Sequence, residues 1–222
     1  MKPGIRKLYV SAFTRIELVV IVAVITILML MILPPLSTVN RREVWQKQCV
    51  ENQRQLEIAY KTWAVDCGAE FPMYYRTNDG GTREFVLEGK MFRHYQAMSN
   101  ELGGTKLLVC PSDTRLVASS FDALQNTNIS YFVGVDASDT YPQLILLGDR
   151  NLKNPRSLAN SLFVVLDTDS AAYWTGEMHH DKGIVGIADG SVRVFSTPGL
   201  QKYLHDSVPP NAVHTNWIVL PE

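Results

Sequence analysis

The chain has 222 residues, which is enough for one domain with a sizeable core and an additional segment. Its 21 Lys and Arg residues nearly balance its 22 Asp and Glu residues, and the net charge of −1 argues against a general nucleic-acid-binding protein. Three of the basic residues, Lys2, Arg6 and Lys7, fall in the first 11 residues, which contain no acidic residue. A basic flank before an apolar segment predicts that the N-terminus stays in the cytoplasm.

The next segment is apolar from Leu18 to Leu33, and Thr26 is the only polar residue within it. A helix of these 16 residues would extend about 24 Å, and Phe13 and Ile16 lengthen it towards the ~30 Å core of a bilayer. No small-residue cleavage site of a secretory signal follows, because Pro34 comes next. Hydropathy alone therefore predicts a single-pass membrane anchor.

Glu17 stands at the start of this run, where an ionised carboxylate costs several kcal/mol at membrane depth unless it finds a partner. With its flanking residues, AFTRIEL from Ala12 to Leu18, it resembles the prepilin signal of type IV pilins and type II secretion pseudopilins. In that signal a basic leader ends in a small residue, Phe begins the mature chain, and Glu is its fifth residue. Two positions depart from the usual pattern, with Ala12 in place of Gly and Arg15 in place of an apolar residue.

The resemblance implies that a prepilin peptidase cleaves between Ala12 and Phe13 and that the new amino group of Phe13 is N-methylated. Glu17 would then neutralise the Phe13 amine of a neighbouring subunit during assembly. The implied partners are the peptidase, other pilin or pseudopilin subunits, an inner-membrane assembly platform and the lipid bilayer. The resemblance thus implies a structural subunit, not an enzyme, of a type II secretion or type IV pilus-like filament. Such a subunit is single-pass in the inner membrane, with its head in the periplasm.

Two other functions stay open. The chain could be a membrane-anchored periplasmic enzyme or metal-binding protein whose signal only resembles a prepilin. It could also be a minor subunit at a filament tip that binds a secreted cargo or a surface, which would require an exposed apolar patch on the head. The sequence contains no G-x-S-x-G, no H-E-x-x-H and no phosphate-binding loop.

After Ser37 the helical pattern continues in polar form, with an apolar stripe that includes Trp45 and Trp63, and we expect both side chains to pack in the core. Gly68 is the predicted end of this amphipathic helix. The expected fold is α+β, a long N-terminal helix packed on a C-terminal antiparallel sheet, and the resemblance implies a pilin-like head. The predicted segments are a leader (1–12), a transmembrane and assembly helix (13–36), its amphipathic continuation (37–68) and a periplasmic head (69–222).

Within the head, runs rich in β-branched and aromatic residues predict strands, and no long helical pattern separates them, so we expect an antiparallel meander. A short helix is expected around 91–98. The expected strands are 106–110, 129–135, 143–147, 162–166, a hairpin of 183–188 with 191–195, and 215–220.

The chain has three cysteines, whose spacing fits no zinc pattern. In an oxidising compartment one disulfide can form and one thiol is left over. The resemblance implies a bridge between Cys49 and Cys110, because many large-headed pseudopilin-like proteins carry a Cys in the first helix and a later Cys-Pro-x-Asp. Cys67 is the rival partner, and a chain without any bridge is the other alternative.

A second resemblance to prepilin-type proteins is the H-x9-DG element formed by His179 and Asp189-Gly190. Asp-Gly between two apolar runs predicts a hairpin turn, and on a structural interpretation His179 begins this hairpin and hydrogen-bonds near its turn. On a functional interpretation, His179, His180, Asp181 and Asp189 join Asp167 and Asp169 to hold a metal. Calcium occurs in some pseudopilin heads but prefers oxygen ligands, and zinc accepts His and Asp although these residues lack a compact spacing. We expect no cofactor, and calcium is the one ion that the functional interpretation leaves open.

Overall fold

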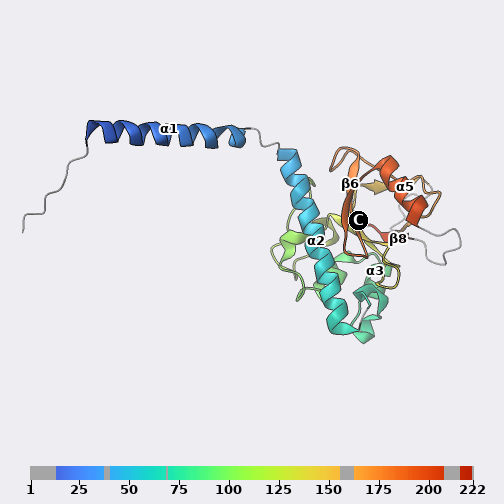
Figure 1. Cartoon of the computed structure of the whole chain (residues 1–222). Coiled ribbons are helices and arrows are strands. Elements are labelled where there is room, and N and C mark those ends of the chain that lie inside the picture. The colour runs from blue at the N-terminus through green and yellow to red at the C-terminus, as the bar shows by residue number, and fades with distance from the viewer. Residues whose placement is uncertain (1–13, 38–40, 69, 156–162, 208–215, 222) are drawn as a thin grey trace, which may run out of the picture. The chain divides into compact units, whose positions relative to one another are not determined.

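Figure 1 shows the computed structural model of the chain, which describes residues 14–37, 41–68, 70–155, 163–207 and 216–221. The chain divides into two compact units, Met1–Arg41 and Arg42–Glu222. The first unit contains α1 (Arg15–Ser37), whose side chains are described up to Leu30. Among the described residues, no helix combines the length and the hydropathy of a membrane span.

In the second unit, α2 (Arg41–Cys67) packs buried apolar residues, Leu56 and Tyr60 among them, into the larger of two hydrophobic cores. It ends where predicted, because Gly68 adopts a φ of +131° and its N–H donates to the carbonyl of Ala64 at 3.2 Å. Trp63 is buried, as its place in the apolar stripe predicts, whereas the expectation that Trp45 packs in the core is wrong, since it is 43% exposed. The buried face of α2 also includes polar side chains, namely Asn52, Gln53 and Glu57.

Six strands of the described residues form one sheet in the order β4-β8-β1-β2-β6-β7, and every neighbouring pair is antiparallel. The predicted α+β class with an antiparallel sheet is therefore confirmed. The predicted meander is wrong, because β8, the last strand in sequence, lies between β4 and β1. A second, two-stranded sheet consists of β3 and β5. The strands are β1 Tyr131–Gly134, β2 Ile145–Asp149, β3 Leu152–Lys153, β4 Phe163–Leu166, β5 Tyr173–Trp174, β6 Lys182–Ile187, β7 Val192–Ser196 and β8 Asn216–Val219.

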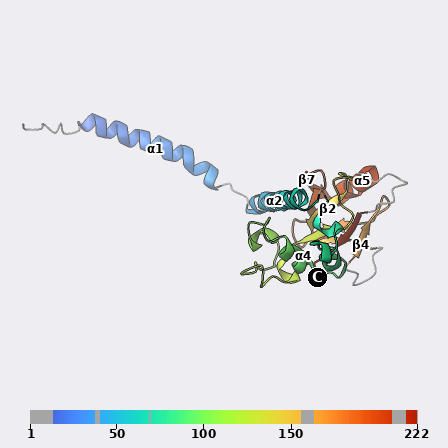
Figure 2. The ribbon, with the colours of Figure 1, turned by 90° about the horizontal axis from the view of Figure 1, so that it is seen from below.

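Successive residues of a strand point to opposite sides of a sheet. The residues of the large sheet accordingly pack into two hydrophobic cores, one on each face. On one face, Tyr131 and Val133 join the core that includes α2. On the other face, Phe132 packs in a second core with Leu200 of α5 (Thr197–Ser207). Figure 2 shows α2 and α5 beside the strands of this sheet. The sheet thus holds the end of β2 and the start of β6 close to α2, where the candidate site lies.

The strand predicted at 106–110 is wrong, because the chain forms a short 3-10 helix, η3 (Thr105–Leu108), at this point. Two carbonyl groups of this segment accept hydrogen bonds from residues that do not belong to a neighbouring strand. The N–H of Ser130 donates to the Leu108 carbonyl at 2.8 Å, and Asn52 Nδ2 donates to the Val109 carbonyl at 3.1 Å. The remaining short elements are η1 Pro72–Tyr74, η2 Thr77–Asp79, α3 Arg83–Leu87, α4 Met91–Ala97 and η4 Asn126–Asn128.

Candidate functional site

Glu17, the residue predicted to guide assembly, also caps its own helix. Thr14 precedes α1, and both its N–H and its hydroxyl donate to Glu17 Oε2, at 2.8 and 2.9 Å. The N–H of Glu17 in turn donates to Thr14 Oγ1 at 3.3 Å. This reciprocal pair is a capping box, which satisfies free N–H groups of the first helical turn. Ala12 and Phe13 lie outside the described residues, so cleavage between them stays a prediction.

A buried disulfide joins Cys49 of α2 to Cys110 in the loop after η3, 61 positions apart. It is the pairing that the resemblance implies, and the exposed Cys67 keeps a free thiol. His179 Nε2 lies 3.3 Å from Cys110 Sγ and 3.5 Å from Asp149 Oδ2. We call Cys49, Cys110, His179 and Asp149 the sulfur–histidine cluster. It connects α2, the η3 loop, the end of β2 and the segment before β6.

Asp149 is fully buried, and two hydrogen-bond donors hold its carboxyl group in place. Gln53 Nε2 donates to Oδ1 and the N–H of Ile184 donates to Oδ2, both at 2.8 Å. Burial outweighs these two bonds and raises the pKa of Asp149 to about 8. Burial likewise lowers the pKa of His179 to about 4. Both groups are therefore uncharged at neutral pH, and their contact is not an ion pair.

The segment that delivers His179 to this cluster has an unusual backbone. His180 and Asp181 have φ values of +51° and +59°, in the left-handed region that residues other than glycine rarely adopt. Each such residue costs of order 1 kcal/mol or more, so two in succession persist only where the surrounding structure requires them. Here they reverse the chain before β6, which leaves His180 and Asp181 nearer the surface than the buried His179.

The Asp189-Gly190 pair forms the hairpin turn between β6 and β7. Gly190 has a φ of +90°, and its N–H donates to the Ile187 carbonyl at 2.8 Å. Asp189 Oδ1 accepts from the N–H of Ser191 at 2.7 Å, which fixes the turn further. The expectation that His179 bonds near this turn is wrong. His179 precedes β6 at its other end, and six extended residues cover about 20 Å.

The metal set predicted around the H-x9-DG element is not assembled. Asp167 and Asp169 follow β4, and Asp189 lies at the far end of β6 from His179. Within the described part of the chain, the group of His, Cys, Asp and Glu side chains close enough for a metal joins His179 to the two bonded cysteines. The described residues therefore do not bring the residues proposed for calcium into one site.

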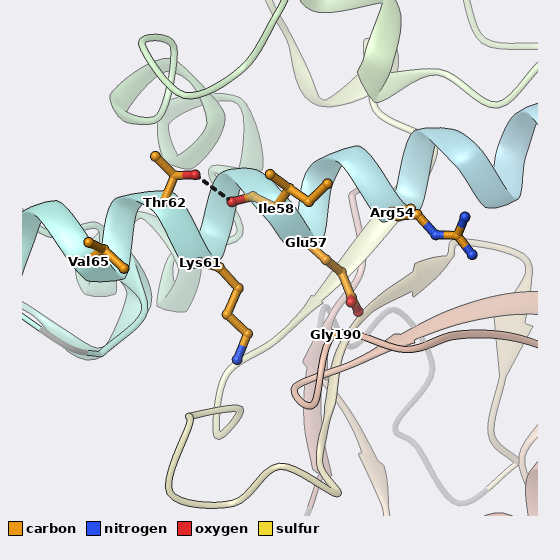
Figure 3. A pocket seen from close by; sticks show the side chains of 7 residues that line it. All are labelled: Arg54, Glu57, Ile58, Lys61, Thr62, Val65 and Gly190. Carbon is orange, nitrogen blue, oxygen red and sulfur yellow. Dashed lines mark hydrogen bonds between the residues drawn. The ribbon is translucent and has the colours of Figure 1, made fainter.

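A pocket of about 330 Å³ lies between α2 and the hairpin turn. Figure 3 shows Glu57 pointing from α2 towards Gly190 at its base. Glu57 is only 1% exposed, and neither of its carboxyl oxygens has a hydrogen-bond partner among the described residues. Gly186 of β6 leaves the space for this group, because a Cβ there would collide with Glu57 Oε1. The other lining residues are Arg54, Ile58, Lys61, Thr62 and Val65.

The cations beside Glu57 do not neutralise it. Lys61 pairs with Asp139, and Arg54 lies 3.8 Å from a carboxylate in the preceding turn of α2. Burial, followed by repulsion from Asp189, raises the pKa of Glu57 to about 8. At neutral pH the pocket therefore has a protonated carboxyl group at its base and mostly apolar walls.

Sequence reasoning missed Gln53, Glu57 and Asp149. Gln53 and Glu57 follow Cys49 at i+4 and i+8, so helical periodicity could have placed them on its buried face. Asp149 ends a strand and has no local signal of its role. The capping box was also missed, although Thr14-x-x-Glu17 is its usual pattern.

No known protein family, no curated protein and no solved structure matches this chain. Its function is therefore inferred from its sequence motifs and from the contacts of the described residues.

Proposed function

We propose that the protein is a structural subunit of a filament, of the type IV pilin or type II secretion pseudopilin kind, assembled through α1. The observation that carries the proposal is the surface of this helix. Every described side chain from Thr14 to Leu30 is exposed, and most are large and apolar. A continuous apolar surface of this kind needs a cover. The inner membrane provides it before assembly, and neighbouring helices provide it afterwards.

Glu17 distinguishes an assembly helix from a plain anchor. A plain anchor gains only the helix cap from this carboxylate, whereas a filament can also pair it with the cationic N-terminus of another subunit. The capping contacts with Thr14 support this role, because they fix the carboxylate at the first turn, where that N-terminus would approach. Cleavage by a prepilin peptidase at Ala12-Phe13 would create the amine. The head would then lie on the periplasmic side, consistent with a buried disulfide.

The proposal is tested with Glu17→Ala in cells that contain the assembly machinery. Removing one partner of a desolvated ion pair costs about 3–5 kcal/mol, so the yield of filaments should fall more than ~100-fold. Insertion into the membrane, measured by resistance to carbonate extraction, should stay at the wild-type level. Glu51→Ala is the matched control, because Glu51 is an exposed acid of α2 that pairs with Arg54 and accepts a hydrogen bond from Gln55, both in the same helix. If Glu17→Ala chains form filaments as well as the wild type, the assembly mechanism is wrong.

A further inference from the structure

We propose that the sulfur–histidine cluster is a zinc site in the reduced protein and that the disulfide and the metal exclude each other. The site would bind Zn²⁺ through two cysteine sulfurs, the Nε2 of His179 and a carboxyl oxygen of Asp149. This inference does not depend on the filament function. It concerns the state of the chain before its disulfide forms or after the disulfide is reduced.

The positions of the non-sulfur ligands already fit tetrahedral zinc. Zinc lies about 2.3 Å from sulfur and about 2.0–2.1 Å from nitrogen or oxygen, so adjacent ligands in a tetrahedron are ~3.4–3.8 Å apart. His179 Nε2 is 3.3 Å from Cys110 Sγ and 3.5 Å from Asp149 Oδ2. The ligand atoms of Cys49, Cys110 and His179 all lie within 4.8 Å of one another. Asp149 lies outside this group, so the two sulfurs would have to separate from each other and also approach Asp149 Oδ2 before all four ligands could bind one ion.

The surroundings of the cluster match those of a structural metal site. All four residues are buried, and they come from four separate parts of the head. Asp149 is oriented by Gln53 Nε2 and by the N–H of Ile184. Outer hydrogen bonds of this kind commonly hold ligands in the geometry a metal requires. Two thiolates balance the charge of Zn²⁺, and the donors Gln53 Nε2 and Ile184 N–H stabilise the remaining charge of the Asp149 carboxylate.

The chemistry balances through a dithiol reductant. Two electrons and two protons from the dithiol convert the Cys49–Cys110 disulfide into two thiols, and the dithiol becomes a disulfide. Zn²⁺ then displaces one proton from each thiol and one from the Asp149 carboxyl group, and two Zn–S bonds and one Zn–O bond form. An oxidant that rebuilds the disulfide removes both sulfur ligands and releases the metal.

The test uses the full-length chain, unfolded and reduced, then refolded in detergent with a non-thiol reductant. Co²⁺ serves as the probe, because thiolate-bound tetrahedral cobalt has characteristic absorption. The reduced wild type should bind one equivalent, and the oxidised protein should bind none. Zn²⁺ should displace the Co²⁺ and should protect Cys49 and Cys110, but not Cys67, from alkylation.

Variants identify the ligands. Cys49→Ser should abolish the cobalt–thiolate absorption, and His179→Ala and Asp149→Asn should each weaken binding at least ~10-fold. Cys67→Ser is the matched control, because it removes an exposed thiol and should leave binding unchanged. Equal binding by Cys49→Ser and wild type would overturn the proposal, and unchanged binding by Asp149→Asn would overturn the assignment of the fourth ligand. If the reduced chain does not refold alone, circular dichroism gives the answer. Refolding on addition of Zn²⁺ supports the site, and no binding with no refolding refutes it.

Discussion

Glu57 provides a sharp test of the electrostatics of the head, through the substitution Glu57→Gln. The pKa of Glu57 is raised to about 8, mainly because its carboxyl group is buried without a hydrogen-bond partner among the described residues. The folded chain therefore holds this proton more tightly than the unfolded chain, in which the pKa is about 4.5. The contribution of this proton to the free energy of unfolding is fully present below pH 4.5 and is lost as the pH rises to about 8.

The size of this effect on stability follows from the difference between the two pKa values of Glu57. A tenfold change in proton affinity corresponds to about 1.4 kcal/mol, so ionisable Glu57 costs the folded state up to ~3 kcal/mol at pH 7 and ~5 kcal/mol above pH 8. A glutamine side chain at this position keeps the shape and cannot ionise. We therefore expect the free energy of unfolding of Glu57→Gln to exceed that of the wild type by a margin that grows from pH 5 to pH 8. The comparison between the two proteins cancels the other groups that titrate in this range, Asp149 among them.

The assay is urea unfolding of the full-length chain in detergent at several pH values, followed through tryptophan fluorescence, to which the buried Trp63 and Trp174 contribute. Glu51→Gln is the control, since this exposed carboxyl of the same helix should change stability by less than ~0.5 kcal/mol at every pH. If the difference between Glu57→Gln and wild type does not vary between pH 5 and pH 8, the buried, protonated state assigned to Glu57 is incorrect.

Two further predictions concern the backbone and the disulfide of the head. Cys110→Ala, measured without added metal, should lower the free energy of unfolding by about 4 kcal/mol, because the disulfide closes a loop across 61 positions. Cys67→Ala should have little effect, since Cys67 is a free thiol. Equal losses of stability in the two variants would show that the disulfide does not form. Gly190→Ala should cost about 1–2 kcal/mol because of its φ of +90°, although no atom closer than 3.9 Å opposes a Cβ there. Gly103→Ala, at an open position without a positive φ, is the control, and similar costs for the two would contradict the turn geometry.

The sequence predicted those parts of the fold that depend on local patterns. The end of α2 at Gly68, the Asp189-Gly190 turn and the antiparallel strands all have short-range signals, and the structure confirms them. The insertion of β8 beside β1 has no such signal, because it depends on contacts between segments some 80 residues apart. The failed strand at 106–110 has the same cause, since its carbonyls are bonded by distant Asn52 and Ser130.

The candidate sites divide in the same way. Glu17 is recognisable from sequence because a charge in an apolar run is conspicuous. The sulfur–histidine cluster is not, because its members come from four segments and Asp149 has no distinctive neighbours. His179 was singled out, but its assignment to Asp167, Asp169 and Asp189 assumed that a motif's residues meet in space. The extended β6 strand keeps His179 and Asp189 apart.

The central claim is that α1 is an assembly helix and that a prepilin peptidase removes the leader before it. This claim is tested most directly by the mass of the mature N-terminus. The chain is produced together with the peptidase, isolated from the membrane fraction and examined by mass spectrometry. The proposal predicts a chain that begins at Phe13 and carries one methyl group on its amine. An intact chain that begins at Met1 would contradict it and would favour a membrane-anchored periplasmic enzyme or metal-binding protein.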